Sequence, residues 1–312
     1  MADWSDLGLL DNPFEPTEFR GVENVTLLQD LVTAPLQVHV EPNLKPLYCL
    51  DLGPFSGHLR KFQNDLRLKG YRQQPPQSGR LSFVFTICGP KGSGKSSLAN
   101  MMIDWLKGCL SPGEGPWDVE ERFRDDPGSS AEEQGRVIGD LQSDIEKKQV
   151  KYHCIVLDNL INGADRAAFV MWTGLRKTRQ VVMFLIADDL PILRSGFSGI
   201  NMRPYVTTAL SADDGVRFVK HRMSCFRAKH FPWLEQFPLF PFSESDIREM
   251  LTPRHSGEEI VTLRQFSVYL SEALKMFLLG LGPFDPGGAS AQQVESMLID
   301  LETAVASLAR EV

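Results

Sequence analysis

Residues Gly89–Ser96 read G-P-K-G-S-G-K-S, a complete G-x-x-x-x-G-K-[ST] pattern. An apolar segment rich in β-branched and aromatic residues precedes it at 81–88, and a segment with helical spacing of apolar residues follows at 97–106. A strand, a glycine-rich loop and a helix in this order form a phosphate-binding loop, because the backbone N–H groups point toward an anion. The pattern therefore predicts an α/β fold that binds a nucleotide.

Each residue type in the loop suits a phosphate ligand. The glycines allow the backbone to turn with its N–H groups inward, Lys95 can reach the β- and γ-phosphates, and the Ser96 hydroxyl can ligate Mg²⁺. We therefore expect ATP and Mg²⁺ as cofactors. The expected nucleotide-binding residues are Gly89, Pro90, Lys91, Gly92, Ser93, Gly94, Lys95, Ser96 and Ser97.

Composition excludes several other classes of protein. The 312 residues are 42% hydrophobic and 23% charged, which is ordinary for a globular chain with a large core. The five cysteines are scattered without a C-x-x-C pair, so neither disulfides nor a zinc site is expected. The N-terminus lacks the features of a leader, and no apolar run approaches the roughly 18 residues of a membrane span. A cytoplasmic protein without a membrane partner is expected.

Charge allows only local contacts with nucleic acid. The formal net charge of −7 argues against adhesion over the whole surface. Two basic patches remain, at 60–80 and at 217–230, and solvated helical faces with salt-bridge partners are the favoured interpretation of both. Nucleic-acid binding through either patch stays open.

Alternating strands and helices follow the loop. We expect strands at 152–157, 180–187 and 205–209, with a short edge strand near 117–123, and helices at 95–107, 131–149 and 165–178. Such an order gives a parallel sheet with right-handed crossovers, whose ligands gather at the carboxyl ends of the strands. The phosphate loop, Asp158 and Asp188 all fall at such ends.

Three regions are predicted along the chain. Residues 1–80 are rich in proline and are expected to form an irregular N-terminal wrap. Residues 81–210 form the nucleotide-binding core, and residues 211–312 a helical lid domain with helices at 210–227, 243–251, 262–278 and 289–310.

The second half of the site is expected at Asp158. This carboxylate ends an apolar strand about sixty residues after the loop, where it can hold Mg²⁺ beside the Ser96 hydroxyl. The next residue is Asn159, which can orient a water molecule but cannot accept its proton. Hydrolysis is therefore expected to be slow, unless Asp188, Asp189 or another acid supplies the base.

The order of these parts resembles the AAA+ superfamily, and within it the ORC-like and STAND-like bacterial ATPases. The resemblance of the lid rests on three segments. They are 207–214 (T-T-A-L-S-A-D-D), 239–247 (L-F-P-F-S-E-S-D-I) and 263–266 (L-R-Q-F). The resemblance covers approximately residues 81–280. The early Asn12-Pro13-Phe14 also looks like an opening found in several bacterial ATPases of this type, although an Asn-Pro turn is the favoured interpretation.

The resemblance implies roles for further residues. Asn159 stands where such ATPases usually carry a catalytic Glu, and Asp188 looks like the sensor 1 residue. Arg203, or alternatively Arg194, would reach a neighbouring subunit, and Arg264 would be the sensor 2 arginine of the lid. With Lys95 and Asp158, these are the expected catalytic residues.

The leading hypothesis is a slow, nucleotide-dependent ATPase switch with self-association or a protein partner. In related architectures such switches serve DNA transactions or bacterial defence, and the sequence does not choose between them. One alternative is a phosphotransferase, with residues 193–197 near the acceptor. Another is a nucleotide-binding scaffold without hydrolysis, which Asn159 supports.

Overall fold

The structure is a computed structural model. It describes residues 4–15, 46–47, 52–69, 82–108, 117–123, 130–189, 204–208, 210–227, 238–251 and 261–281. These residues form two compact units, of which one takes in 53–208 and the other takes in the described residues outside that range. The boundaries expected near residues 80 and 210 stay predictions.

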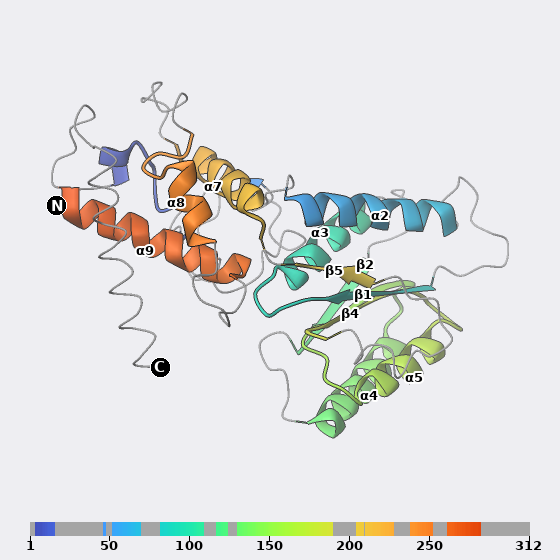
Figure 1. The fold of residues 1–312 in the computed structure, drawn as a ribbon. Coiled ribbons are helices and arrows are strands. Elements are labelled where there is room, and N and C mark those ends of the chain that lie inside the picture. The colour runs from blue at the N-terminus through green and yellow to red at the C-terminus, as the bar shows by residue number, and fades with distance from the viewer. Residues whose placement is uncertain are drawn as a thin grey trace. The chain divides into compact units, whose positions relative to one another are not determined.

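The first unit is built on a parallel sheet. Its described strands are β1 (Ser82–Cys88), β2 (Trp117–Arg122), β3 (Tyr152–Leu157), β4 (Gln180–Ala187) and β5 (Pro204–Val206). They pair in parallel in the order β2-β3-β4-β1-β5 (Figure 1). The predicted strands at 152–157 and 180–187 are confirmed, and the predicted short edge strand near 117–123 is β2.

Helices cover both faces of this sheet, so the α/β fold class is confirmed. Helices α2 (Gly53–Lys69) and α3 (Lys95–Gly108) lie on one face, and α4 (Ala131–Lys147) and α5 (Asp165–Leu175) lie on the other (Figure 1). Burial on both faces explains why the strands read as continuous apolar runs, a pattern typical of parallel sheets. All six residues of β3 are buried.

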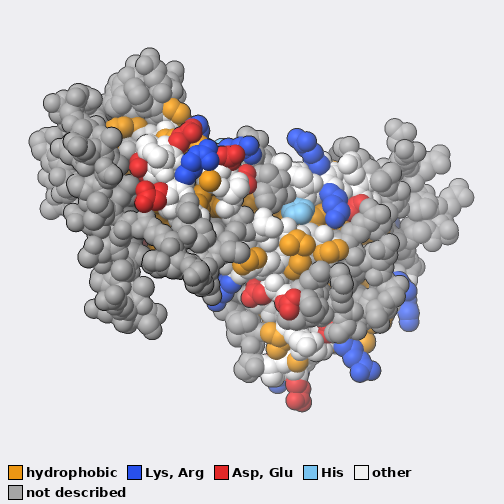
Figure 2. Space-filling model, viewed as in Figure 1, with side chains coloured by type: hydrophobic (Ala, Val, Ile, Leu, Met, Phe, Trp, Pro, Cys, Tyr) orange, Lys and Arg blue, Asp and Glu red, His pale blue; other side chains and the backbone are white. Residues whose placement is uncertain are grey.

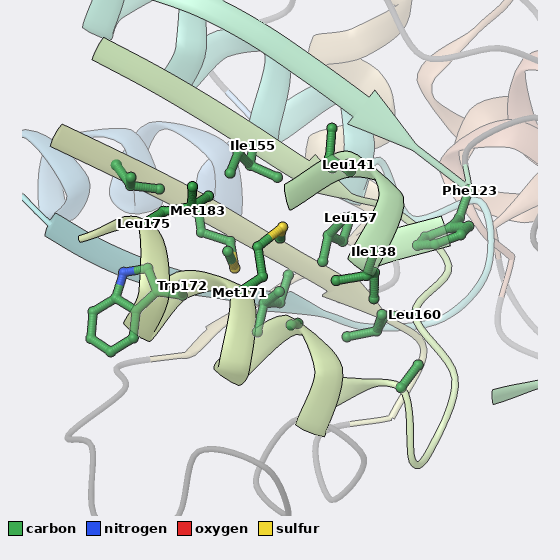
Figure 3. Close-up of a cluster of buried hydrophobic side chains, with 14 of the residues drawn as sticks. Phe123, Ile138, Leu141, Ile155, Leu157, Leu160, Met171, Trp172, Leu175 and Met183 are labelled. Carbon is green, nitrogen blue, oxygen red and sulfur yellow. The ribbon is translucent and has the colours of Figure 1, made fainter. Parts of the chain in front are cut away.

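Two apolar layers hold the helices to the sheet. On the side of α4 and α5, Leu141, Met171 and Trp172 pack against Leu157 and Met183 (Figure 3). On the side of α2 and α3 the contacts are aromatic. There the Phe62 ring of α2 lies 4.9 Å from Phe85 and 5.8 Å from Phe184, measured between ring centroids.

Helix α2 was not expected, because the segment 1–80 was interpreted as irregular. For residues 53–69 that interpretation is wrong. Pro54 does not break this helix, because it lies in the first turn, where its missing N–H leaves no intrahelical bond unmade.

The same helix covers the free edge of β5. The Nε2 atom of His58 lies 2.8 Å from the carbonyl oxygen of Val206, and the Lys61 ammonium donates to the carbonyl oxygen of Pro204 at 3.4 Å. The ammonium of Lys61 also lies 4.8 Å from the centre of the Tyr205 ring. Side chains of α2 therefore contact backbone carbonyl groups that an edge strand would otherwise leave without a hydrogen-bond partner.

The second unit is helical over the residues described. It contains a short 3₁₀ helix, η1 (Trp4–Leu7), and the helices α7 (Ala212–Phe226), α8 (Glu244–Met250) and α9 (Leu263–Leu281). Ser211 and Ser243 cap α7 and α8 by accepting backbone N–H groups. The helix expected at 289–310 lies outside the described residues, and the role of these helices as a lid stays a prediction.

The N-terminal residues of this unit are anchored to its helices. Asn12 is 2% exposed, and its amide donates to the Ser271 hydroxyl of α9 at 3.0 Å, while its side-chain oxygen accepts the N–H of Phe14 at 3.0 Å. The Phe14 ring lies 6.1 Å from Phe218 of α7 and 6.5 Å from Phe242, again between centroids. The Asn-Pro-Phe motif thus forms a local turn and also ties the start of the chain to α7 and α9.

Candidate functional site

The phosphate loop connects β1 to α3 with a backbone that favours glycine. Gly89, Gly92 and Gly94 have φ angles of 148°, 82° and 88°, in the region that residues with a Cβ rarely adopt. Helix α3 then begins at Lys95. The three glycines therefore give the loop the turn that the motif requires.

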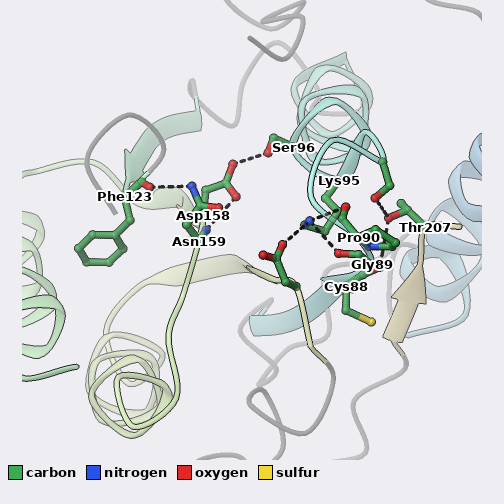
Figure 4. A network of polar contacts seen from close by, with 11 residues as sticks. Cys88, Gly89, Pro90, Lys95, Ser96, Phe123, Asp158, Asn159 and Thr207 are labelled. Atoms are coloured by element: carbon green, nitrogen blue, oxygen red, sulfur yellow. Dashed lines mark hydrogen bonds and ion pairs between the residues drawn. The ribbon is translucent and has the colours of Figure 1, made fainter. Parts of the chain in front are cut away.

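Lys95 is held inside this loop. Its side chain is 6% exposed, and its ammonium donates to the carbonyl oxygens of Gly89 at 2.8 Å and Pro90 at 3.0 Å. The third contact is the Asp188 carboxylate, whose Oδ1 atom lies 2.7 Å away (Figure 4). The cation that would bind phosphates is thus already positioned, with a carboxylate beside it.

Asp158 meets the loop from the end of β3. Its Oδ2 atom accepts a short hydrogen bond from the Ser96 hydroxyl, and its Oδ1 atom accepts the N–H of Asn159 at 2.9 Å (Figure 4). The residue is 2% exposed. A hydroxyl and a carboxylate side by side are hard oxygen donors, which is the ligand chemistry of Mg²⁺. Ser96 and Asp158 therefore fit the magnesium ion expected from the sequence.

The side chain of Asn159 is held away from Ser96. Asn159 has a left-handed φ of 53°, and its amide donates to the carbonyl oxygen of Phe123 at 3.1 Å (Figure 4). Gln134 of α4, which is fully buried, donates to the carbonyl of Asn159 at 3.0 Å and accepts the N–H of Ile161 at 3.1 Å. The turn after β3 is therefore fixed by α4 and by the residue that follows β2.

Thr207 is a site residue that the sequence did not single out for the loop. It follows β5, and its hydroxyl lies 2.6 Å from the Ser93 hydroxyl, while its N–H donates to the Cys88 carbonyl at 2.8 Å. A Cβ atom placed on Gly89 would lie 2.2 Å from the Thr207 carbonyl oxygen. Thr207 thus packs directly on the loop, which explains why position 89 needs glycine in addition to its φ angle.

The remaining predicted residues are not all brought to this place. Asp188 follows β4 and is brought to the loop by its contact with Lys95, whereas its neighbour Asp189 and the loop residue Lys91 are exposed. Arg264 lies in the first turn of α9, in the other compact unit. Arg194 and Arg203, and the segment 193–197 proposed for a phosphate acceptor, lie outside the described residues.

The described cations of α7 favour the salt-bridge interpretation of that patch. Arg217 pairs with Asp214 at 3.4 Å, and Lys220 pairs with Glu244 at 2.9 Å. Figure 2 shows blue and red side chains side by side on the surface of this unit. Nucleic-acid binding through α7 stays a prediction, and these pairings do not favour it.

Two other kinds of site were sought in the described part of the chain. No cluster of three or more metal-binding side chains occurs there. None of the helices described is both long enough and apolar enough to span a membrane.

Comparison with known proteins gives similarity of fold alone. No family model matches the sequence, and no curated protein sequence is significantly similar to it. The Aeropyrum pernix ORC2 protein in its ADPNP-ADP complexes is 13% identical, over 80% of this chain and 67% of its own, with a TM-score of 0.46.

Two further solved structures are similar to the same degree. The E. coli MS115-1 HORMA:CdnC:Trip13 complex is 13% identical, over 91% of this chain and 93% of its own, with a TM-score of 0.47. Drosophila ORC bound to DNA is 11% identical, over 85% and 66%, with a TM-score of 0.46. All three TM-scores lie below 0.5.

Proposed function

We propose that the chain binds ATP with Mg²⁺ and acts as a slow, AAA+-like nucleotide-dependent switch. One observation carries the proposal: Lys95, Ser96 and Asp158 converge at the carboxyl edge of the sheet within a glycine-built loop. This is the combination of a cation, a hydroxyl and a carboxylate that triphosphate binding needs.

In this proposal different residues bind the phosphates and the magnesium ion. The backbone N–H groups of the loop and the Lys95 ammonium would hold the phosphates, since both offer positive charge to an anion. Ser96 and Asp158 would hold the magnesium ion, which when bound neutralises charge on the β- and γ-phosphates. The Lys95 ammonium, now paired with Asp188 at 2.7 Å, would exchange this carboxylate for phosphate oxygens when the nucleotide binds.

Slow turnover is proposed from the residue after Asp158. An amide cannot take the proton of an attacking water, and this amide already donates to the Phe123 carbonyl. Nucleotide occupancy would then last long enough to act as a signal. A scaffold without hydrolysis is the second candidate, supported by the same residue, and it differs from the switch only in the absence of turnover.

A binding measurement with two matched lysine variants tests the proposal. Lys95→Ala should weaken Mg²⁺–ATP binding by roughly 10- to 100-fold, because a charged hydrogen bond contributes about 1.5–3 kcal/mol. Lys91→Ala removes an exposed cation from the same loop and should change affinity far less. Titration calorimetry of the full chain measures both. Absence of ATP binding by the parent protein would refute the function.

The oligomeric part of the proposal needs its own experiment. Arg194 or Arg203 would act on a neighbouring subunit, and Arg264 would act from the helical region as a lid. Mass measurement in solution with ATP, with ADP and without nucleotide should show a nucleotide-dependent assembly, which Lys95→Ala abolishes. An assembly state that ignores nucleotide would leave ATP binding standing and remove self-association.

A further inference from the structure

We propose that Asp188, and not residue 159, supplies the carboxylate that takes the proton from the attacking water. The inference rests on the proposed function, since it concerns hydrolysis of the ATP bound there. It assigns a general base where residue 159 provides none. Turnover remains slow in this proposal because the same carboxylate is paired with Lys95 until ATP binds.

The sheet places Asp188 between the two halves of the site. Strand β4 pairs with β1 on one side and β3 on the other, and Ala187 at its end pairs with Cys88, directly before the loop. Asp188 follows Ala187 at the carboxyl edge. Its backbone therefore lies between the strand that leads to the phosphate loop and the strand that leads to Asp158.

The carboxylate already contacts the cation that marks the phosphate position. Asp188 Oδ1 lies 2.7 Å from the Lys95 ammonium, while 60% of the Asp188 side chain is exposed. Exposure matters because a general base must receive a proton and then return it to solvent. Asp158 is poorly suited to this task, since it is 2% exposed and bonded to Ser96 and to the Asn159 N–H.

Residue 159 is turned away from this position. Its left-handed backbone and the hydrogen bond to the Phe123 carbonyl direct the side chain toward the end of β2. A longer acid at 159 would lose that bond and would not gain the contact with Lys95 that Asp188 has. A carboxylate at 159 is therefore not equivalent to the one at 188.

The chemical step is balanced by one proton transfer. The water oxygen forms a bond to the γ-phosphorus, and the bond between that phosphorus and the bridging oxygen breaks, with the electron pair leaving on ADP. The water proton passes to a carboxylate oxygen of Asp188 and from there to solvent. Lys95 leaves Asp188 for the phosphate oxygens as ATP binds, which frees the carboxylate for this role.

Three variants of the full chain test the assignment. Asp188→Asn should lower kcat for ATP by about 100-fold or more, the size expected for loss of a general base. It should bind Mg²⁺–ATP at least as tightly as the parent, because no carboxylate then competes for Lys95. Asp189→Asn, the exposed neighbour, should change kcat by less than about twofold. Asn159→Glu should not raise kcat.

The measurements are single-turnover cleavage at saturating ATP and, separately, calorimetric binding. Parent-like kcat in Asp188→Asn, or faster cleavage by Asn159→Glu, would overturn the assignment while leaving ATP binding intact. A parent protein that binds ATP without any cleavage would also overturn it and favour the scaffold. Failure of the parent to bind ATP refutes the proposed function itself, so the two failures are distinguishable.

Discussion

The side-chain amide of Asn159 donates to the carbonyl oxygen of Phe123 at 3.1 Å, and both residues have left-handed backbones, with φ angles of 53° and 67°. Left-handed backbone is tolerated by asparagine and is rare for a bulky residue such as phenylalanine. The hydrogen bond therefore joins two uncommon conformations at the point where β2 and β3 both end.

Two replacements of Asn159 separate the contribution of its left-handed backbone to stability from that of its side-chain hydrogen bond. Asn159→Gly keeps the left-handed angle and loses only the bond, at a cost of about 0.5–1.5 kcal/mol. Asn159→Ala loses the bond and adds about 1–2 kcal/mol for a Cβ in that conformation. Urea unfolding should rank stability as parent, then Gly, then Ala. Equal stability of Gly and Ala would contradict a left-handed residue here.

Gly89 is expected to tolerate no side chain. In Gly89→Ala the new Cβ would meet the Thr207 carbonyl oxygen at 2.2 Å, and φ is 148°, so we expect a loss of about 2 kcal/mol or more and weaker ATP binding. Gly139→Ala is the control, because nothing lies within 4 Å of a Cβ at this exposed position of helix α4. That variant should gain about 0.5–1 kcal/mol. Thermal unfolding distinguishes the opposite signs.

The lowered pKa of His153 predicts how the free energy of unfolding changes with pH. Burial lowers the pKa of this imidazole, although Asp118, 3.3 Å from Nδ1, and the Val150 carbonyl act in the opposite direction, and Arg179 and Lys148 lower it further. The unfolded chain therefore binds the proton more readily. The free energy of unfolding should fall as pH drops below about 6.5.

The variant His153→Gln isolates this contribution from other acid effects. The difference in unfolding free energy between the parent and the variant should change with pH between about 7 and 5, with the parent losing more. Denaturant unfolding at several pH values provides the measurement. A constant difference would show that the buried imidazole titrates equally in the folded and unfolded chain.

Asn12 is expected to stabilise the helical unit. Asn12→Ala removes the bond to Ser271 and the bond from the Phe14 N–H, and should cost about 1–3 kcal/mol. Leu10→Ala alters a neighbouring side chain that is 61% exposed and should cost little. Limited proteolysis should cut the Asn12 variant faster within the helical unit. Similar cleavage of both variants would mean that the N-terminal segment contributes little.

Much of the first unit could be predicted because its signals are local. Strands such as 152–157 and 180–187 are buried on both faces, so apolar character alone marks their limits. The loop could be predicted because phosphate binding requires both a tightly turned backbone, which the three glycines allow, and a cation, which Lys95 provides. The positions of Asp158 and Asp188 followed from the rule that ligands lie at carboxyl ends of parallel strands.

What could not be predicted depends on strand order and backbone angles. Thr207 contacts the loop because β5 pairs with β1, and no local pattern in the sequence specifies that pairing. The sequence also gives no indication of the left-handed φ angle of Asn159, which turns its amide toward Phe123. Helix α2 was not predicted from the sequence, because Pro54 would break a helix in its interior but is tolerated in its first turn.

Thr207 connects the phosphate loop to the end of the edge strand β5. Its side chain contacts the Ser93 hydroxyl at 2.6 Å, and its N–H donates to the Cys88 carbonyl at 2.8 Å. Movement of Ser93 would therefore be passed to the end of the edge strand β5, through a hydrogen bond between side chains 114 residues apart in the chain.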